Sequence, residues 1–301
     1  SKGGNARVFM WESGSPQGEL QSSKPVLSVD IRHDSTSMLA HGGQDFKIKL
    51  YKGPPFKFLQ SYGEHTNFVQ CVRYSPDGKY LATAGSDKKI SILDGDSGDH
   101  LFDLPTEHKG SVYKISWSED GKSLLSVSGD KTAKLWDVPG KSCEGTVTFG
   151  RDIMDMQVGC VFAGNQAITL SLSGAINYVD MKAGKVVDVV QAHTSVPNNV
   201  AADWSSGSGE VYVGTSDGGV FGYTSNGVGT CFDGPKPGSN DALVALKGKL
   251  FSAGHDDTLR SATVGNGTFA FGGPTASLPG TPLSLSLALD DPGLAVTCTG
   301  E

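Results

Sequence analysis

The feature that most constrains the fold of this chain is an internal repeat of about 40 to 45 residues. Two copies show it clearly, because residues 65–94 (HTNFVQCVRYSPDGKYLATAGSDKKISILD) and residues 108–137 (HKGSVYKISWSEDGKSLLSVSGDKTAKLWD) align without a gap. Each copy reads as an apolar strand, a polar turn, a second strand, a tight turn and a third strand. Such units cannot bury their apolar faces alone, so they stack against one another.

The tight turn before the third strand marks further copies along the chain. The markers are Asp45, Asp87, Asp130, Ser173-Gly174, Asp217 and Asp256, with a weak last copy at Gly300-Glu301. The third strands that follow read FKIKLY, KKISIL, KTAKLW, AINYVD, GGVFGY and DTLRSA. They alternate inward apolar with outward polar residues, as half-buried strands do. This period is typical of WD repeats, and it predicts an all-β, WD40-type β-propeller.

The turns carry their own chemistry. Residues 75–78 (SPDG) and 118–121 (SEDG) join a first to a second strand, with Asp able to bond its own backbone and Gly able to adopt positive φ. Glycine is abundant, at 41 of 301 residues, which suits many short strands joined by tight turns. No helical periodicity is sustained over ten residues.

The two ends of the chain leave two architectures open. Residues 5–12 resemble a third strand without its first two, and residues 282–301 resemble two strands that lack a third. One alternative is a seven-bladed ring closed by pairing these two segments. The other is that the chain is a stretch of a longer protein.

Charge and cysteine usage narrow the functional classes. The net charge is −7 and the pI is about 5.5, which disfavours nucleic acid and anionic membrane surfaces as partners. No apolar run resembles a signal core or a membrane span, so we expect a soluble, cytoplasmic protein. Five widely spaced cysteines without a C-x-x-C pair indicate neither disulfides nor zinc, and no cofactor or metal site is expected.

Recurring polar residues suggest a structural hydrogen-bond network rather than a catalytic triad. The WD network positions are occupied by His108, Ser126, Asp130 and Trp136 in one repeat, and by His65, Thr83 and Asp87, with Leu93 in place of Trp, in the repeat before it. A Ser/His/Asp set invites a hydrolase interpretation. However, an enzyme needs one nucleophile, whereas a repeat protein needs the same buried hydrogen-bond network in every blade. We call this network the clamp. We therefore expect no enzymatic activity and no small-molecule substrate. His193 occupies the same place in its own repeat.

Several segments contain residues that are not part of the general WD-repeat pattern. They are GPPFKF (53–58), HTNFVQCVRYSPDG (65–78), GSVYKISWSEDGKSLLSVSGDKTAKLWD (110–137), SLSGAINYVD (171–180) and HDDTLRS (255–261). These segments closely resemble the actin-interacting protein 1 family. The resemblance implies a cytoskeletal protein of two seven-bladed propellers that binds cofilin-decorated actin filaments and promotes their disassembly. It implies that residues 1–230 are blades of a first propeller, incomplete at its N-terminus, and that residues 231–301 are last blades or the start of a second propeller.

The resemblance also suggests a binding surface. Phe56, Phe58 and Phe68 lie in or beside the connection expected between two blades, and Phe58 and Phe68 match aromatic positions associated with actin–cofilin contact in this family. Asp45 and Glu64, together with Lys47 and Lys57, could form a charged rim around such aromatic anchors. The alternative is that the rings pack between blades and the charges are merely solvated.

Two functional hypotheses follow. The first is an actin-binding protein that acts on cofilin-decorated filaments through binding alone. The second is a generic WD-repeat scaffold in another cytoskeletal or multiprotein complex. The fold supports both equally, and only the family-specific segments favour the first.

Overall fold

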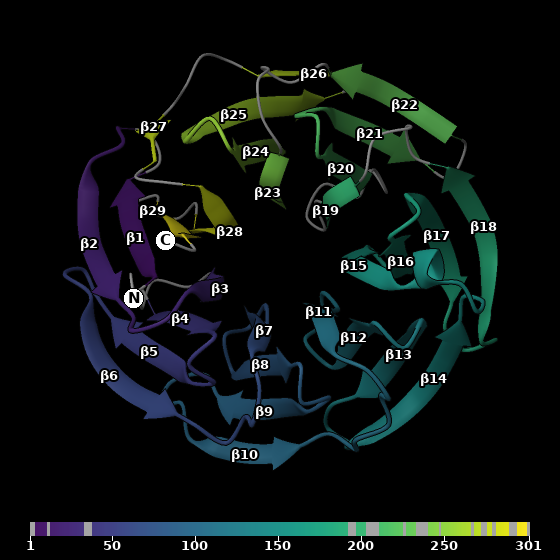
Figure 1. Cartoon of the computed structure of the whole chain (residues 1–301), viewed down its shortest axis with the longest axis horizontal. Coiled ribbons are helices and arrows are strands. Elements are labelled where there is room, and N and C mark those ends of the chain that lie inside the picture. Colours follow the sequence, from purple (N-terminus) through teal and green to yellow (C-terminus); the bar gives the residue numbers. More distant parts are fainter. Residues whose placement is uncertain are drawn as a thin grey trace.

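The computed structural model forms a closed ring of seven β-sheets (Figure 1). It describes residues 4–10, 13–32, 38–191, 197–202, 211–224, 227–232, 240–246, 248–265, 268–271, 276–278, 281–288 and 294–299. The sheets lie radially, with one strand of each at the centre and another at the circumference. We number the sheets blade 1 to blade 7, starting from the first complete one.

Blades 1 to 4 are each built from four consecutive antiparallel strands, which follow one another in chain order from the centre outward. Blade 1 contains β3 (Val26–Ile31), β4 (Met38–Gly43), β5 (Ile48–Lys52) and β6 (Lys57–Tyr62). Blade 2 contains β7 (Val69–Tyr74), β8 (Tyr80–Gly85), β9 (Ile90–Asp94) and β10 (His100–Asp103). Blade 3 contains β11 (Val112–Trp117), β12 (Ser123–Ser128), β13 (Thr132–Asp137) and β14 (Ser142–Thr148). Blade 4 contains β15 (Gln157–Ala163), β16 (Gln166–Ser171), β17 (Ala175–Asp180) and β18 (Lys185–Gln191).

The remaining blades complete the ring. Blade 5 contains β19 (Pro197–Ala202), β20 (Val211–Thr215), β21 (Val220–Thr224) and β22 (Gly227–Phe232). Blade 6 contains β23 (Asn240–Leu246), β24 (Lys249–Gly254), β25 (Thr258–Gly265) and β26 (Thr268–Phe271), and the short β27 (Ala276–Ser277) also pairs with β25. Blade 7 contains β28 (Pro282–Ala288) and β29 (Leu294–Thr299) from one end of the chain, then β1 (Asn5–Met10) and β2 (Pro16–Gln21) from the other.

Blade 7 closes the ring by pairing the two ends of the chain. Strand β1 runs antiparallel to β29, with Ala6 opposite Cys298 and Met10 opposite Leu294. The N-terminal strand is thus the third strand of its blade, as the sequence pattern predicts. The all-β propeller is confirmed, in its seven-bladed ring form. Residues 1–230 and 231–301 both contribute strands to this ring, and their assignment to two propellers of a longer protein stays a prediction.

The turns form as their sequences predict. Asp77 accepts hydrogen bonds from the Ser75 hydroxyl (2.6 Å) and the Lys79 backbone N–H (3.1 Å), and Gly78 has a φ of 70°. The marker aspartates cap the turn between second and third strands in a common way, because each accepts the N–H of the residue two positions later. These are Asp45, Asp87, Asp130, Asp217 and Asp256.

The hydrophobic core is divided into seven clusters, each lying between two neighbouring blades. The cluster between blades 1 and 2, for example, contains the fully buried Ile48, Leu50, Leu81 and Leu93. The stability of each blade therefore depends on both of its neighbours, as is usual in repeat proteins.

The outermost strand of each blade is absent from the three-strand pattern that the sequence shows. Strands β6, β10, β14 and β18 are largely exposed and lack a regular apolar face, so they leave little periodic signal. Much of the Pro54–Phe68 tract is therefore strand β6 rather than a connection between blades. Among the described residues, the one helical element is a 3-10 turn at Ile153–Asp155.

Candidate protein-interaction surface

Blade 1 and its junction with blade 2 carry the aromatic residues that the sequence singles out. The β4–β5 turn places Phe46 beside Phe68, which immediately precedes β7, the inner strand of blade 2. Their ring centroids are 5.8 Å apart with an interplanar angle of 43°, and each side chain is 37% exposed. The pair forms a small apolar surface at the junction of blades 1 and 2.

Phe46 was not among the residues predicted to bind a partner, because the sequence pattern places it at the start of a strand. The structure places it in the turn instead, with a φ of 65°. A left-handed backbone is unfavourable for a bulky side chain, but it is the geometry that this turn adopts in most blades. The other blades place Lys88, Lys131, Gly174, Gly218 or Asp257 at the same turn position, also with positive φ.

Phe58 lies apart from this pair, near the start of the outer strand β6. It pairs with Tyr51 across β5 and β6, whereas Tyr62, near Phe68 in sequence, pairs with Ile48. Because four residues of strand span about 13 Å, Phe58 and Phe68 do not belong to one compact cluster. Phe58 is 59% exposed, with its ring edge-on to Tyr51 at 5.8 Å.

Phe56 differs from these exposed rings. It is only partly exposed and packs against the hydrophobic cluster between blades 7 and 1. Its β-carbon region also lies beside Gly18 of β2. The inter-blade packing alternative therefore describes Phe56, while Phe58 and Phe68 present much of their surface to solvent.

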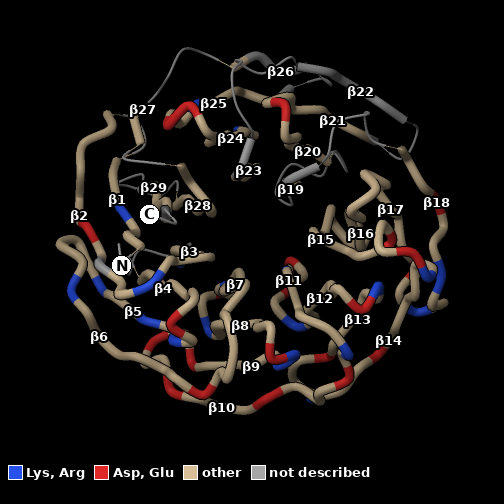
Figure 2. Tube along the Cα trace, in the orientation of Figure 1, with Lys and Arg blue, Asp and Glu red and all other residues tan. Residues whose placement is uncertain are grey.

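The two predicted rim carboxylates have different environments. Asp45 is engaged within blade 1, because it accepts the Lys47 N–H (3.2 Å) and pairs with Lys49 Nζ (2.9 Å). Its role is to fix the turn that presents Phe46. Glu64 is exposed and has no hydrogen bond or ion pair in the described part of the chain. Positive and negative residues lie interspersed around these outer turns (Figure 2).

The predicted WD network is assembled in blade 3. The Trp136 indole N–H donates to Ser126 Oγ (2.8 Å), Ser126 Oγ lies 2.7 Å from His108 Nε2, and His108 Nδ1 lies 3.0 Å from Asp130. Burial opposes ionisation of Asp130, but hydrogen bonds from His108, Thr132 and the Lys109 N–H outweigh it and lower the pKa of Asp130 well below its ordinary value.

Blade 2 assembles a shorter version of the same network. His65 Nδ1 lies 2.9 Å from Asp87 and His65 Nε2 lies 2.9 Å from Thr83 Oγ1. Burial again opposes ionisation of Asp87, but the His65 hydrogen bond and charge and two backbone N–H donors lower its pKa. Leu93 replaces the Trp and is fully buried.

Other blades fill the same space with different polar groups. In blade 1, His41 Nε2 lies 3.2 Å from the Tyr51 hydroxyl, and burial together with the charge of Lys49 lowers the pKa of His41 to about 4. In blade 4, Gln157 Oε1 accepts from Thr169 (2.7 Å) and Asn177 (3.3 Å). The buried network thus recurs from blade to blade, but different polar groups form it. A structural clamp is compatible with such changes, whereas a catalytic triad requires its particular residues. His193 lies outside the described residues.

Two negative findings concern only the residues that the structure describes. No group of three or more His, Cys, Asp or Glu side chains is placed so that it could hold a metal ion. No helix in this part of the chain has the length and apolarity needed to cross a membrane.

Comparisons with known proteins agree with this architecture. The WD domain, G-beta repeat family matches residues 56–94 and 100–137. The chain is 37% identical over 260 residues to WD repeat-containing protein 1 of Gallus gallus, which covers 84% of this chain and 43% of that protein. It is 35% identical over 300 residues to actin-interacting protein 1 of Drosophila melanogaster, covering 98% of this chain and 48% of that protein. The chain thus spans about half the length of the curated relatives it matches.

Solved structures show the same fold at low sequence identity. The crystal structure of the RRP9 WD40 repeats superimposes with a TM-score of 0.81 at 16% identity and covers 97% of both chains. The U3-55K structure gives a TM-score of 0.79, also at 16% identity. At this identity the likeness concerns the fold alone, whereas the sequence matches confirm the predicted resemblance. The chain is a seven-bladed WD-repeat β-propeller related in sequence to actin-interacting protein 1 and WD repeat-containing protein 1.

Proposed function

We propose that this chain binds cofilin-decorated actin filaments and promotes their disassembly, through the outer strand of blade 1 and the junction of blades 1 and 2. The observation that carries the proposal is the exposure of Phe58 and Phe68, the two positions at which the sequence matches the aromatic contacts of the family. Exposed rings on a rigid sheet edge suit protein recognition, because aromatic anchors lose little side-chain entropy on binding.

The geometry divides this surface into two contact points. Phe58, with the neighbouring exposed Leu59, lies near the start of the outer strand β6, whereas the Phe46–Phe68 pair lies between the β4–β5 turn and the start of β7. A partner that contacts both points spans at least the length of β6, so it presents an extended surface rather than a single side chain. An actin filament with cofilin bound along it offers such a surface.

The partly exposed Phe46 extends this surface. Its ring packs against Phe68, and each of the two side chains is 37% exposed. We therefore include Phe46 with Phe58 and Phe68 in the proposed surface, and the exposed Glu64 remains a candidate for its charged rim.

The function is binding rather than bond chemistry. WD40 propellers are typically non-enzymatic scaffolds, and the Ser/His/Asp sets of this chain recur as buried clamps. We propose accordingly that the chain needs no cofactor and acts in the cytoplasm at the actin cytoskeleton. The generic scaffold hypothesis is favoured instead if the chain binds no filaments.

Co-sedimentation with actin filaments, with and without cofilin, tests the proposal. Phe58→Ala and Phe68→Ala should each weaken binding to decorated filaments by about 2 kcal/mol or more, roughly thirtyfold in affinity, because a central anchor loses its buried area. Leu101→Ala is the matched control, since Leu101 is 44% exposed on β10, the equivalent outer strand of blade 2. This control should bind as the unmodified chain does.

Thermal melts of each variant separate binding from folding. An exposed ring should leave the melting temperature nearly unchanged, whereas a ring packed between blades would cost about 3–5 kcal/mol. Unchanged binding by both stably folded variants would refute the surface. Equal affinity for bare and decorated filaments would refute the role of cofilin, and no binding to either would favour the generic scaffold.

A further inference from the structure

The centre of the propeller encloses a cavity of about 230 Å³ lined by the inner strands. The strand registers place equivalent residues at common levels, because each inner strand carries a bulge at the same point. Ser284, Ser28, Cys71 and Lys114 occupy one level. Ser286, Asp30, Arg73 and Ser116 occupy the level two residues further along the strands.

Side-chain oxygens at these levels join three successive inner strands. Ser284 and Ser286 of β28 accept from the backbone N–H groups of Val29 (3.4 Å) and Ile31 (3.1 Å) in β3. Ser28 of β3 accepts in turn from the N–H of Val72 (3.2 Å) in β7, and Asp30 accepts from Tyr74. The preceding blade thereby supplies acceptors for backbone N–H groups on the unpaired edges of β3 and β7.

The pattern of acceptors ends at β7 and is replaced by donors. The equivalent positions of β7 and β11 hold Cys71 and Arg73, then Lys114 and Ser116. Arg73 uses only Nη1 within the protein, donating to Ser28 Oγ (3.2 Å), Val29 O (3.3 Å) and Val72 O (2.7 Å). Its Nε and Nη2 atoms donate no hydrogen bond in the described part of the chain.

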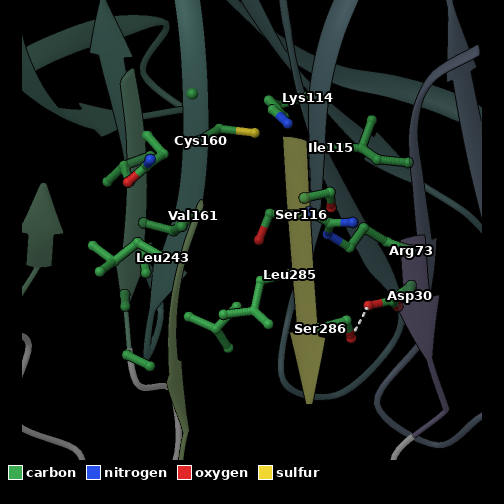
Figure 3. Close-up of a pocket in the computed structure, with 18 of the residues that line it drawn as sticks. Asp30, Arg73, Lys114, Ile115, Ser116, Cys160, Val161, Leu243, Leu285 and Ser286 are labelled. Carbon is green, nitrogen blue, oxygen red and sulfur yellow. Dashed lines mark hydrogen bonds between the residues drawn. The ribbon is translucent and has the colours of Figure 1, made fainter. Parts of the chain in front are cut away.

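Lys114 and Ser116 also have unused donors. Both side chains are half-buried, and neither makes a hydrogen bond or ion pair with any described residue. Lys114 lies beside Cys160 (Figure 3). Burial raises the pKa of the Cys160 thiol, so this thiol is neutral and does not balance the lysine charge. A half-buried ammonium group without a partner favours an anion nearby.

The carboxylates that line the cavity do not supply that partner. Both oxygens of Asp30 already accept hydrogen bonds, from the Tyr74 N–H at 2.7 Å and from the Ser286 hydroxyl at 2.8 Å. Glu119 lies in the β11–β12 turn, beyond the end of β11, and is exposed to solvent. Among the described residues, no carboxylate therefore forms an ion pair with Arg73 or Lys114, which lie at adjacent levels of the cavity.

The opposite wall of the cavity is mostly apolar, with Asn199 of β19 as a polar member. Val161, Leu243 and Leu285 line it, across from the strands that carry Arg73, Lys114 and Ser116 (Figure 3). A ligand that fits this environment combines an anionic group with an aliphatic part. The cavity is smaller than the roughly 300–1,000 Å³ of sites for drug-sized molecules, so the ligand is small.

We propose that the central cavity is a binding site for a small aliphatic carboxylate. Its oxygens accept from the free Arg73 donors, Lys114 Nζ and Ser116 Oγ, because a guanidinium group suits a carboxylate well. Its aliphatic part lies against Val161 and Leu243. The site lies on the axis of the ring and is separate from the outer edge of blade 1.

Butyrate is a suitable probe for nuclear magnetic resonance titration of the isotope-labelled chain in buffer free of other oxyanions. Saturable shifts are expected at millimolar butyrate in the backbone amides of residues 114–116 and 159–161. Butylammonium, which has the same aliphatic part and the opposite charge, should produce none. Lys114→Met should weaken butyrate binding about tenfold or more, since a charge-assisted hydrogen bond is lost.

Two further variants complete the test. Lys114→Arg keeps the positive charge and should retain binding, and it serves as the second variant if Lys114→Met reduces folding. Lys185→Met, on the exposed outer strand β18, removes a lysine far from the cavity and should bind as the unmodified chain does. The proposal is overturned by the absence of saturable shifts, by an equal response to butylammonium, or by unaltered butyrate binding in folded Lys114→Met.

Discussion

Blades 2 and 3 contain the same His–Asp pair but end their hydrogen-bond networks differently. In blade 3 the network continues from His108 through Ser126 to the buried indole of Trp136. In blade 2, Thr83 takes the place of Ser126, and its hydroxyl lies 3.5 Å from the Ser91 carbonyl, while Leu93 fills the space of the indole. The His–Asp–hydroxyl unit is thus common to both blades. The fourth residue of the network can be one that hydrogen-bonds, such as Trp136, or an apolar one, such as Leu93.

Converting blade 3 into blade 2 should have the largest effect. Trp136→Leu removes a ring that is 1% exposed, together with its hydrogen bond to Ser126. We expect a loss of about 3 kcal/mol in the free energy of unfolding, from the cavity and the lost bond. Urea unfolding followed by circular dichroism measures it. A loss well below 1 kcal/mol would show that the indole is dispensable.

Removing the histidine from each clamp should have the next largest effect. His108→Ala and His65→Ala each leave a buried carboxylate and hydroxyl without their partner, at a cost of about 1–3 kcal/mol. His108→Ala should cost more, because Ser126 also holds Trp136. Thermal melts of both variants give the comparison.

His100→Ala is the matched control for these variants. His100 also pairs with a carboxylate, Asp103 at 3.0 Å, but on the exposed strand β10. Exposed pairs contribute little, so its melting temperature should hardly change. If His65→Ala and His108→Ala were as mild as this control, the clamps would not stabilise the blades.

Acid should affect blade 2 through its outer strand. Burial opposes ionisation of Asp103, but hydrogen bonds from Lys89, Ser91 and His100 lower its pKa from 3.8 to about 2. Since the folded-state pKa lies below the unfolded value, the stabilisation is present above about pH 4 and is lost as pH falls toward 2. Asp103→Asn should make the loss of stability over this window shallower, as measured by melts at each pH.

Blade 3 offers the control for the acid experiment. Its residue at the equivalent register is Thr146, which lies opposite Lys134 and has a hydroxyl in place of the carboxylate. Thr146→Val should leave the pH dependence of stability unaltered. An identical pH profile for Asp103→Asn and the unmodified chain would contradict the role of Asp103.

The smallest effect concerns the turn lysines of the two blades. Lys88 and Lys131 have φ values of 73° and 68°, which glycine adopts without strain. Lys88→Gly should raise the free energy of unfolding by about 0.5 kcal/mol, because relief of left-handed strain slightly exceeds the entropy cost of glycine. Lys131→Gly should gain less, since Lys131 Nζ donates to the Arg151 carbonyl at 2.6 Å. Equal gains, measured by urea unfolding, would mean that this bond contributes nothing.

Much of the local structure could be predicted from the sequence. The third strands, the Asp-Gly turns such as Asp77-Gly78 and the members of the His–Asp clamps are where the repeat indicates. Each of these depends on residues close together in the chain or at matching places in successive repeats. Their chemistry is local, since a turn aspartate bonds its own backbone and glycine adopts positive φ wherever it stands.

The candidate surface was predictable only in part. Phe58 and Phe68 are exposed, but Phe58 lies on the outer strand β6, whose exposed residues leave no regular pattern, and Phe68 lies beside the inner strand β7 of the next blade. Phe46 was missed because a turn and a strand start look alike after Asp45. The repeated positive φ after each marker residue is a signal that could have placed it in the turn.

The sequence by itself determined the repeat period, the order of strands within a blade and the polar clamp, since these arise from local propensity and alternation. The tertiary structure decided the closure of the ring through β1 and β29, the position of the fourth strands and the gathering of Arg73 and Lys114 around one cavity. These features depend on contacts between residues far apart in the chain. Their energies come from shared burial between blades, which no single repeat encodes.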